Sequence, residues 1–363
     1  MATILFAGGG TGGHLYPAIA IAEEILKQDP SVKIIFTGTK AKIEARVVPQ
    51  KGFEFHTIWI SGFSRRLTVN NLLFPVKVVV SLLQSFFLMK RVRPDVVVGT
   101  GGYVCGPVLF IASLLGIPTV VHESNSYPGV TTRLLASRVT KVFITFDVTK
   151  RYLSSSAAVE LVGNPTRAEL SSVSREEGSR FFGLDPAKKT LFAFGGSLGA
   201  ASINKAMPEV VKDAVANDYQ VIWQTGESDW NSASAVPQHA NIKVMKYVDR
   251  MDCGYAAADV IVSRSGATTL AELTRLGKPA LLVPYPHAAA NHQEQNAQAM
   301  VESGAALMIK DSELNAGLLP AVYGLLFDDK KQDSMAERSR RLGRPNAGSV
   351  IAGAILSLKR KGA

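Results

Sequence analysis

Short apolar, β-branched runs alternate with helical stretches along most of the chain. The runs predict buried strands, and the helical stretches between them predict crossover connections. Strands joined in this way are parallel and covered by helices on both faces, so the pattern indicates an α/β fold. The predicted strands are Thr3–Ala7, Lys33–Thr37, Asp95–Val98, Thr119–His122, Lys141–Thr145, Thr190–Phe194, Gln220–Gln224, Ile242–Met245, Asp259–Ser263 and Pro279–Pro284.

A coarse repeat divides the chain into halves. The segments LFAGGGTGG (5–13) and LFAFGGSLGA (191–200) each read as strand, glycine turn and helix, and each opens a strand–helix series. We therefore expect two Rossmann-like domains whose parallel sheets face a central cleft, a number that suits a chain of 363 residues. The expected domains are 1–163 and 164–341, with a final helix in 342–363 that packs back on the first domain.

Composition narrows the class of protein. The formal net charge of +10 favours an anionic partner, whether a nucleotide, a phospholipid surface or a nucleic acid. The chain has no uninterrupted apolar run of about 20 residues and no secretory-signal pattern at its N-terminus. Cys105 and Cys253 are its only cysteines, which excludes a disulfide framework and favours a reducing cytoplasm.

The first glycine turn matches a known fingerprint. Gly8, Gly10 and Gly13 form G-x-G-x-x-G between a predicted strand and a predicted helix, as in dinucleotide-binding proteins. That fingerprint also calls for an acid after the second strand, whereas this chain has Thr39 and Lys40 there. An NADP-dependent oxidoreductase therefore stays open, because Lys40 could hold a 2′-phosphate, and so does a purely structural turn.

Glycine turns recur in both halves, within residues 96–107, 194–202 and 260–273. Glycine lets phosphate or sugar oxygens approach the backbone closely, and the N–H groups that open a helix favour an anion. Such turns in both halves predict a ligand that is gripped from both sides of the cleft.

Polar residues follow the turns of the second half. If a helix begins near Ala267, Glu272 lies about 7.5 Å along its axis, within reach of the ribose hydroxyls of a nucleotide bound at the helix start. The alternative is an exposed charge on an amphipathic helix. Asn291 and Glu294 match a capping box, which would place Gln293 in a first turn where it could bind sugar hydroxyls.

Seven motifs in order resemble the MurG family of GT-B glycosyltransferases. They are GGGTGGHLYPAIAIA, GTGGYVCGP, HESNSYPG, GNPTR, GGSLGA, SRSGATTLAE and NHQEQNA. Enzymes of this family add N-acetylglucosamine (GlcNAc) from UDP-GlcNAc to undecaprenyl-pyrophosphoryl-MurNAc-pentapeptide, which turns lipid I into lipid II. The resemblance implies the same fold and substrates here, with no cofactor and no nucleic-acid partner.

The resemblance also implies residue roles. Donor binding falls to Thr11, Gly12, Gly13, Asn125, Arg167, Ser197, Val248 (through its backbone), Ala267, Thr268, Thr269, Leu270, Glu272 (on the ribose) and Gln293 (on the GlcNAc hydroxyls). The acceptor side falls to Gly101, Gly102 and Tyr103. His292 stands where the family often has a glutamine, so that contact is left open.

The implied reaction is an inverting transfer to the 4-hydroxyl of MurNAc, which requires a base. His14 is the candidate, because imidazole titrates near neutrality and the preceding loop would place it at the cleft. A ring that merely braces the following helix is the alternative. Glu123 is a second candidate, either as the base or as a partner that orients a histidine. The chain contains no D-x-D motif, so we expect no divalent metal to be needed.

The segment 72–93 suggests how such an enzyme would reach a lipid-anchored acceptor. Lys77, Ser81, Gln84 and Ser85 form one narrow polar stripe on an otherwise apolar helix. The flanking cations are Arg65, Arg66, Lys90, Arg91 and Arg93. An apolar patch ringed by cations suits an anionic membrane surface, so we expect a peripheral protein on the cytoplasmic face of the cell membrane. A core helix between two layers is the alternative.

Three further functions remain compatible with the pattern. A regulatory module could bind a UDP-sugar without chemistry. An epimerase or a glycolipid glycosyltransferase could share the donor half, because the second domain mainly encodes nucleotide recognition.

Overall fold

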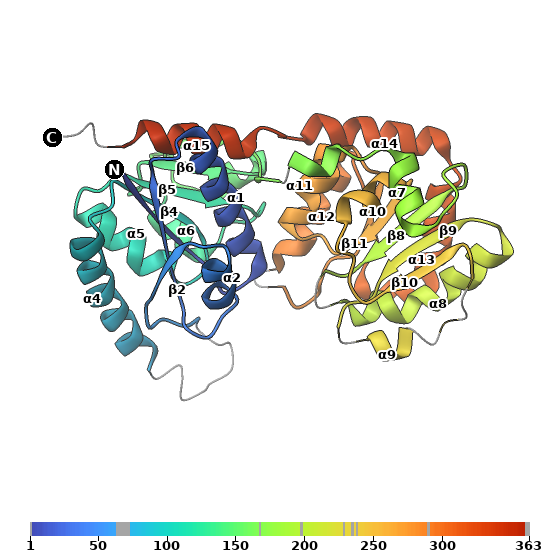
Figure 1. Cartoon of the computed structure of the whole chain (residues 1–363), viewed down its shortest axis with the longest axis horizontal. Coiled ribbons are helices and arrows are strands. Elements are labelled where there is room, and N and C mark those ends of the chain that lie inside the picture. The colour runs from blue at the N-terminus through green and yellow to red at the C-terminus, as the bar shows by residue number, and fades with distance from the viewer. Residues whose placement is uncertain are drawn as a thin grey trace. The chain divides into compact units, whose positions relative to one another are not determined.

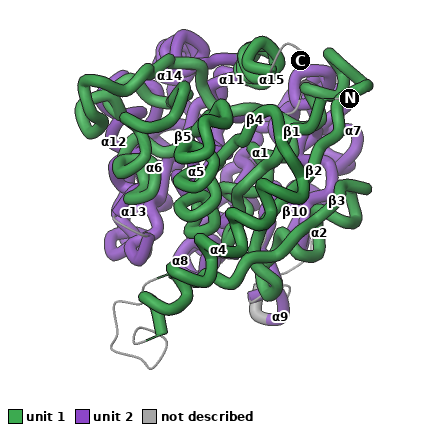
Figure 2. The backbone as a smooth tube through the Cα atoms, turned by 90° about the vertical axis from the view of Figure 1, so that its left-hand side faces the viewer, with its two compact units in different colours: residues 1–166, 345–363 green, residues 167–344 purple. Residues whose placement is uncertain are grey.

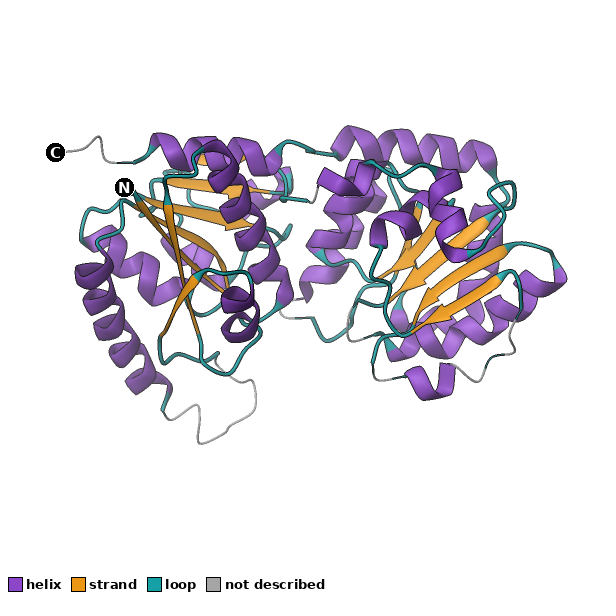
Figure 3. Ribbon diagram, in the orientation of Figure 1, coloured by secondary structure: helices purple, strands orange, loops and turns teal. Residues whose placement is uncertain are grey.

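The computed structural model describes residues 2–62, 73–166, 168–196, 199–227, 229–233, 236, 239–288 and 291–359. The chain divides into two compact units, one of residues 1–166 with 345–363 and one of residues 167–344 (Figure 2). Both junctions lie a few residues beyond the boundaries expected from the sequence. Each unit holds a parallel sheet with helices on both faces, which confirms the predicted α/β class (Figures 1 and 3).

The first unit is built on a seven-stranded sheet in the order β3-β2-β1-β4-β5-β6-β7. Its strands are β1 (Thr3–Gly8), β2 (Lys33–Gly38), β3 (Glu54–Thr57), β4 (Val96–Gly101), β5 (Thr119–Glu123), β6 (Lys141–Ile144) and β7 (Val159–Leu161). Its helices are α1 (Gly12–Gln28), α2 (Glu44–Gln50), α4 (Phe74–Val92), α5 (Cys105–Leu114), α6 (Val130–Leu135), the 3-10 turn η1 (Asp147–Tyr152) and α15 (Ala347–Ser357).

The central strand β1 supplies both faces of this unit's core. Ile4 and Phe6 point to one face, where they join the buried side chains of α1 and α15. Leu5 and Ala7 point to the other face, where α4, α5 and α6 supply the cover. Alternate residues of one strand are therefore buried on opposite sides, which is why the strand reads as a continuous apolar run.

The second unit has a six-stranded sheet in the order β10-β9-β8-β11-β12-β13. Its strands are β8 (Thr190–Phe194), β9 (Gln220–Gln224), β10 (Ile242–Met245), β11 (Val260–Ser263), β12 (Ala280–Leu282) and β13 (Leu307–Met308). Its helices are η2 (Ala168–Ser171), α7 (Arg175–Phe182), α8 (Ala201–Ala216), α9 (Trp230–Ala233), α10 (Met251–Ala257), α11 (Ala267–Leu276), α12 (His292–Glu302), η4 (Asp311–Glu313), α13 (Leu314–Leu326) and α14 (Asp329–Leu342).

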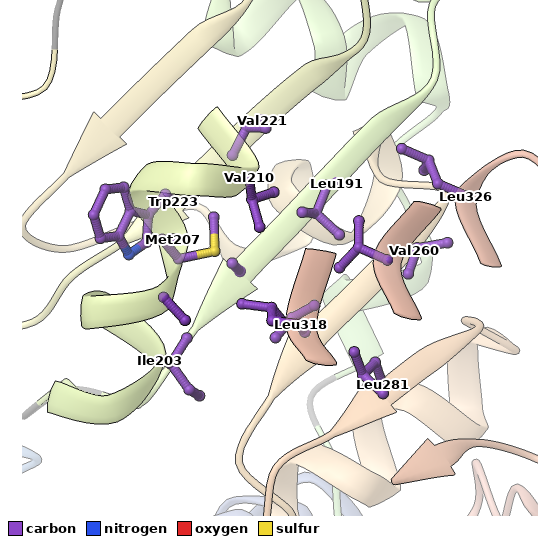
Figure 4. Close-up of a cluster of buried hydrophobic side chains, with 14 of the residues drawn as sticks. Leu191, Ile203, Met207, Val210, Val221, Trp223, Val260, Leu281, Leu318 and Leu326 are labelled. Carbon is purple, nitrogen blue, oxygen red and sulfur yellow. The ribbon is translucent and has the colours of Figure 1, made fainter. Parts of the chain in front are cut away.

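The core of the second unit lies between its sheet and the helices α8 and α13 (Figure 4). Leu191 of β8 packs there with Met207 and Leu318. Trp223 is fully buried at the edge of this cluster, and its indole N–H donates to Asn204 Oδ1 over 3.0 Å. The buried polar tip of the ring is thus paired, as burial of an indole N–H requires.

Each of the ten predicted strands is present, with small shifts at some ends. The sequence missed β3, β7 and β13, and each of these is the outermost strand of its sheet. Their residues are only half-buried or exposed, so they lack the apolar run that marks the inner strands.

Helix α4 turns most of its polar stripe toward the protein, whereas the fourth member, Gln84, is exposed. Lys77, Ser81 and Ser85 are buried, and Lys77 Nζ donates to Ser61 Oγ over 3.0 Å. The apolar residues Val76, Val79, Leu83 and Phe87 are instead 49–66% exposed. The alternative of a helix wholly inside the core is therefore wrong for this face. No described helix combines the length and apolar character needed to span a bilayer.

Candidate functional site

The first unit brings two glycine turns together where its neighbouring strands β1 and β4 end. Gly101 and Gly102 adopt φ values of +106° and +84°, which favour glycine. A Cβ on Gly101 would lie 2.4 Å from His14 Nδ1, and one on Gly102 would lie 2.5 Å from the Gly9 carbonyl oxygen. The missing side chains therefore allow the second turn to pack directly on the first.

His14 is anchored by this close packing. Its Nδ1 lies 3.1 Å from the Thr100 carbonyl oxygen, and Thr100 Oγ1 donates to the His14 carbonyl oxygen over 2.8 Å. Because a carbonyl only accepts, Nδ1 carries a proton in this contact, and Nε2 is the basic nitrogen of the neutral ring. The ring is half-buried in the first turn of α1. The ring thus braces helix α1 and keeps its proton on Nδ1. The interpretation of His14 as a brace and its interpretation as a base are therefore compatible.

The first glycine turn offers fewer free amides than expected. The Gly10 N–H donates to Glu44 Oε2 over 2.9 Å, so it is already occupied by a carboxylate of the protein. The N–H groups of Gly12 and Gly13, at the start of α1, have no acceptor among the described residues. Thr11 is exposed beside them. The helix-start N–H groups of this turn that remain open to an anion are therefore those of Gly12 and Gly13, and the Gly10 N–H is not among them.

Glu123 is buried and fully engaged at the end of β5. Oε1 accepts from Asn125 N–H over 3.0 Å and from Asn125 Nδ2 over 3.3 Å. Oε2 accepts from Gly129 N–H over 3.0 Å and from Thr132 Oγ1 over 2.7 Å. This carboxylate organises the loop that carries Asn125, which argues against its use as a base.

His122 lies in β5 beside Glu123, and Tyr103 lies two residues after β4. His122 is fully buried, its Nε2 lies 2.9 Å from the Gly163 carbonyl oxygen, and burial lowers its pKa, so the ring stays neutral. Tyr103 is 57% exposed, and a Cβ on Gly62 would lie 2.0 Å from its ring. The end of the tyrosine ring therefore packs against the Gly62 backbone, and more than half of the residue stays exposed.

In the second unit, α11 begins at Ala267, the helix start from which the distance to Glu272 was predicted. The N–H groups of Ala267, Thr268 and Thr269 have no acceptor among the described residues, and no side chain caps them. Leu270 is buried and its N–H bonds to the Gly266 carbonyl oxygen over 3.0 Å, so it belongs to the helix itself. The three preceding amides are thus open at the helix start, where an anion is favoured.

Glu272 lies one turn further along α11. It is buried, which rules out the alternative of an exposed surface charge, and Oε2 accepts from Tyr255 Oη–H over 2.8 Å. The tyrosine was not identified from the sequence, because it comes from α10, and no motif or spacing links that helix to Glu272 of α11. Its hydroxyl fixes one carboxylate oxygen and thereby orients Glu272.

Gln293 of α12 contacts both the loop before α12 and the turn before α11. Gln293 Oε1 accepts from Tyr285 N–H over 3.0 Å, and the Gln293 carbonyl oxygen accepts from Ser265 Oγ–H over 2.7 Å. The predicted capping box is wrong, because Asn291 adopts a left-handed conformation and its side chain bonds to the Glu294 side chain instead of the backbone. Gln293 is still in the first turn of α12, as expected.

Arg264 is a residue of this edge to which the sequence assigned no role. Its guanidinium pairs with Asp311, donates to Ser202 Oγ over 2.9 Å and to the Val283 and Pro284 carbonyl oxygens, and stacks over the ring of Tyr285. It therefore ties the segments that surround α11.

Of the remaining predicted residues, Val248 is among those that the structure describes. Val248 is buried and its N–H donates to Gln224 Oε1 over 2.9 Å, so recognition of a base there would depend on its carbonyl group. Arg167 and Ser197 lie outside the described residues. Arg65 and Arg66, expected to flank the apolar helix, also lie outside them.

Two parallel-sheet α/β units with glycine turns at their strand ends match the GT-B fold. Residues 4–144 match the glycosyltransferase family 28 N-terminal domain, and residues 190–349 match the family's C-terminal domain. The chain therefore belongs to glycosyltransferase family 28, and within it to the MurG group.

The similarity to known proteins extends over nearly the full chain. The chain is 40% identical to a UDP-N-acetylglucosamine--N-acetylmuramyl-(pentapeptide) pyrophosphoryl-undecaprenol N-acetylglucosamine transferase of Flavobacterium psychrophilum, covering 98% of this chain and 97% of that protein. It is 43% identical to a protein of the same name in Desulfitobacterium hafniense, covering 97% and 98%. The crystal structure of Acinetobacter baumannii MurG matches with a TM-score of 0.77 and 27% identity, covering 98% of this chain and all of that one.

Proposed function

We propose that this protein transfers GlcNAc from UDP-GlcNAc to the MurNAc 4-hydroxyl of lipid I, with inversion, and so forms lipid II. The observation that carries the proposal is identity of 40–43% over nearly the whole chain to transferases named for this reaction. Both halves of the family pattern are present, which argues against a module that shares only the donor half.

The donor belongs to the second unit in this proposal. The free amides at residues 267–269 would bind the pyrophosphate, and Glu272, oriented by Tyr255, would accept hydrogen bonds from the ribose hydroxyls. Gln293 would bind the sugar. The open helix start also stabilises the charge that develops on departing UDP, since its dipole is already aligned.

The base belongs to the first unit. His14 donates through Nδ1 to Thr100, so Nε2 would take the proton of the acceptor hydroxyl as the new glycosidic bond forms. The amides of Gly12 and Gly13 would bind the sugar and phosphate of the donor, and the exposed ring of Tyr103 would bind the acceptor. No metal or cofactor takes part in this mechanism.

A lipid-anchored acceptor requires contact with the membrane. The exposed apolar face of α4 has exposed Lys90, Arg91 and Arg93 at its C-terminal end, and α4 packs on α5, which adds the exposed Leu114. Apolar side chains flanked by cations suit an anionic bilayer surface. We place the protein on the cytoplasmic face of the membrane as a peripheral enzyme.

The direct test is transfer of radiolabelled GlcNAc from UDP-GlcNAc to a lipid I analogue, run with and without EDTA. We expect product in both arms, because the mechanism uses amides and an imidazole rather than a metal. Loss of product in EDTA would refute the metal-free mechanism. UDP-GlcNAc binding by calorimetry without any UDP release in the presence of acceptor would show a binding module instead. Oxidation or reduction of a nicotinamide cofactor would favour the oxidoreductase.

A further inference from the structure

A buried carboxylate lies beneath the first glycine turn. Glu44, in the first turn of α2, has no exposed surface. Oε2 accepts from Gly10 N–H over 2.9 Å, while Oε1 accepts from Thr39 N–H over 3.0 Å and from Thr39 Oγ1 over 2.8 Å. Gly10 follows β1 and Thr39 follows β2, so one side chain fastens the loops that leave two neighbouring strands.

The backbone around Glu44 is shaped to admit it. A Cβ on Gly9 would lie 2.4 Å from the carboxyl carbon Cδ, and one on Gly38 would lie 2.5 Å from Cγ. Neither approach is compatible with a side chain at those positions. Gly10 itself adopts φ +85°, with open space where its Cβ would be. Glycine is therefore needed at Gly9 and Gly38, where a side chain would overlap that of Glu44. It is also needed at Gly10, where the backbone turns with a positive φ.

The charge of this carboxylate is balanced by donors of the loops themselves. Burying an ionised carboxylate is costly unless it is hydrogen-bonded or paired. Among the described residues Glu44 has three donors and no ion pair. Charge-assisted bonds of this kind are stronger than neutral ones, so the loops keep this arrangement only while the carboxylate is present.

We infer that Glu44 is a positioning residue for the transfer reaction: an internal anion that occupies the Gly10 amide and fixes the turn that leads into His14. The inference rests on the proposed function and adds a residue to it. Glu44 accepts a hydrogen bond from the Gly10 N–H. At the other end of the same turn, His14 is held by its contacts with Thr100. With both ends fixed, the amides of Gly12 and Gly13 and the imidazole are presented in one geometry. The Gly10 amide itself is unavailable to a ligand phosphate.

The test compares Glu44→Ala and Glu44→Gln with a matched control, Asp95→Ala. Asp95 Oδ2 accepts from Thr3 N–H over 2.7 Å, so it also fastens β1 through a backbone amide, but at the start of the strand rather than at the glycine turn. For Glu44→Ala we expect kcat to fall about 10- to 100-fold, the range for a displaced catalytic group, with the KM for UDP-GlcNAc nearly unchanged. Glu44→Gln keeps one acceptor and places an NH2 group toward the donors, so an intermediate loss is expected. Asp95→Ala should lower the unfolding midpoint and leave kcat close to that of the parent protein.

A second measurement does not depend on activity. Hydrogen exchange of the Gly10 amide should speed up about tenfold or more in Glu44→Ala, because its acceptor is gone, and should not change in Asp95→Ala. A folded Glu44→Ala protein with the parent kcat would overturn the inference, as would unchanged Gly10 exchange. A loss of kcat matched by Asp95→Ala at equal loss of stability would reduce Glu44 to a purely structural role. If the parent protein transfers no GlcNAc, the proposed function fails, while the exchange measurement still tests the hold of Glu44 on the turn.

Discussion

His14 and Glu123 are titratable residues of the same sheet edge, and they differ in what their polar atoms do. His14 uses Nδ1 to hold Thr100 and keeps its basic nitrogen on the other side of the ring. We expect His14→Ala to lower kcat by about 10²–10⁴-fold, the usual contribution of a general base, without weakening UDP-GlcNAc binding. Single-turnover transfer and calorimetric titration of the donor would measure the two effects separately.

Glu123→Gln is the comparison for that prediction. Replacing one oxygen by an NH2 group sets a donor against donors, because all four partners of Glu123 donate. We expect a lower unfolding midpoint together with lower activity, since the loop that carries Asn125 loses its anchor. If Glu123→Gln is stable but inactive while His14→Ala keeps full turnover, Glu123 is the base and His14 is not.

Residues whose position follows from their place in one element could be predicted, and contacts that reach across elements could not. Glu272 was placed from a helix start at Ala267, because the helical rise converts spacing into distance. Glu44 was not predicted, because the dinucleotide fingerprint calls for an acid at the end of β2, whereas this carboxylate comes from the following helix and accepts from the Gly10 amide in the turn after β1. Tyr255 was missed for the same reason. No spacing rule reports such contacts.

At the scale of elements, the inner strands were predictable and the outer ones were not. A strand buried on both faces requires a continuous apolar run, so β1 and β8 are evident in the sequence. The outer strands β3 and β13 are shorter and half-exposed, and their residues carry no such constraint. The polar stripe of α4 was recognised, but only the structure shows that it faces Ser61 and the protein interior.

The orientation of α4 makes a specific prediction about membranes. The double variant Leu83→Ser with Phe87→Ser removes two of its most exposed apolar side chains, which are 55% and 66% exposed. If each contributes about 1 kcal/mol or more to insertion, binding to anionic vesicles should weaken about tenfold or more in a sedimentation assay.

The matched control for α4 lies in the second unit. Tyr323→Ser with Phe327→Ser removes two aromatic residues of comparable exposure, 46% and 43%, near the end of α13. Vesicle binding should be unchanged in this protein. Transfer to a water-soluble acceptor analogue should survive in both variants, since neither touches the proposed site. Equal loss of vesicle binding in the two proteins would show that general apolarity, and not α4, mediates the contact.

At the scale of the whole molecule, the first unit is completed by the end of the chain. Helix α15 buries Ile351 and Ile355 against α1, and Lys359 pairs with Asp29 just after α1. The hydrogen bond from this lysine, together with those from the Ser31 hydroxyl and N–H, lowers the pKa of the Asp29 carboxyl to about 2. Because the folded-state pKa lies below the unfolded value near 3.8, this pair stabilises the fold above that value and is lost as the pH falls toward 2.

Deleting residues 345–363 should therefore destabilise the first unit and spare the second. Removing the two buried isoleucines alone costs about 3–6 kcal/mol, at ~1.5–3 kcal/mol for each side chain. That loss is comparable with the whole stability of many domains, so we expect calorimetry to show an early transition that the full chain lacks. UDP-GlcNAc identifies the other transition, because a ligand raises the unfolding temperature only of the unit that binds it. If the truncated protein melts in one step that UDP-GlcNAc shifts as a whole, the two units do not unfold independently. A truncation after Lys359, which keeps α15 and the pair with Asp29, should behave like the full chain.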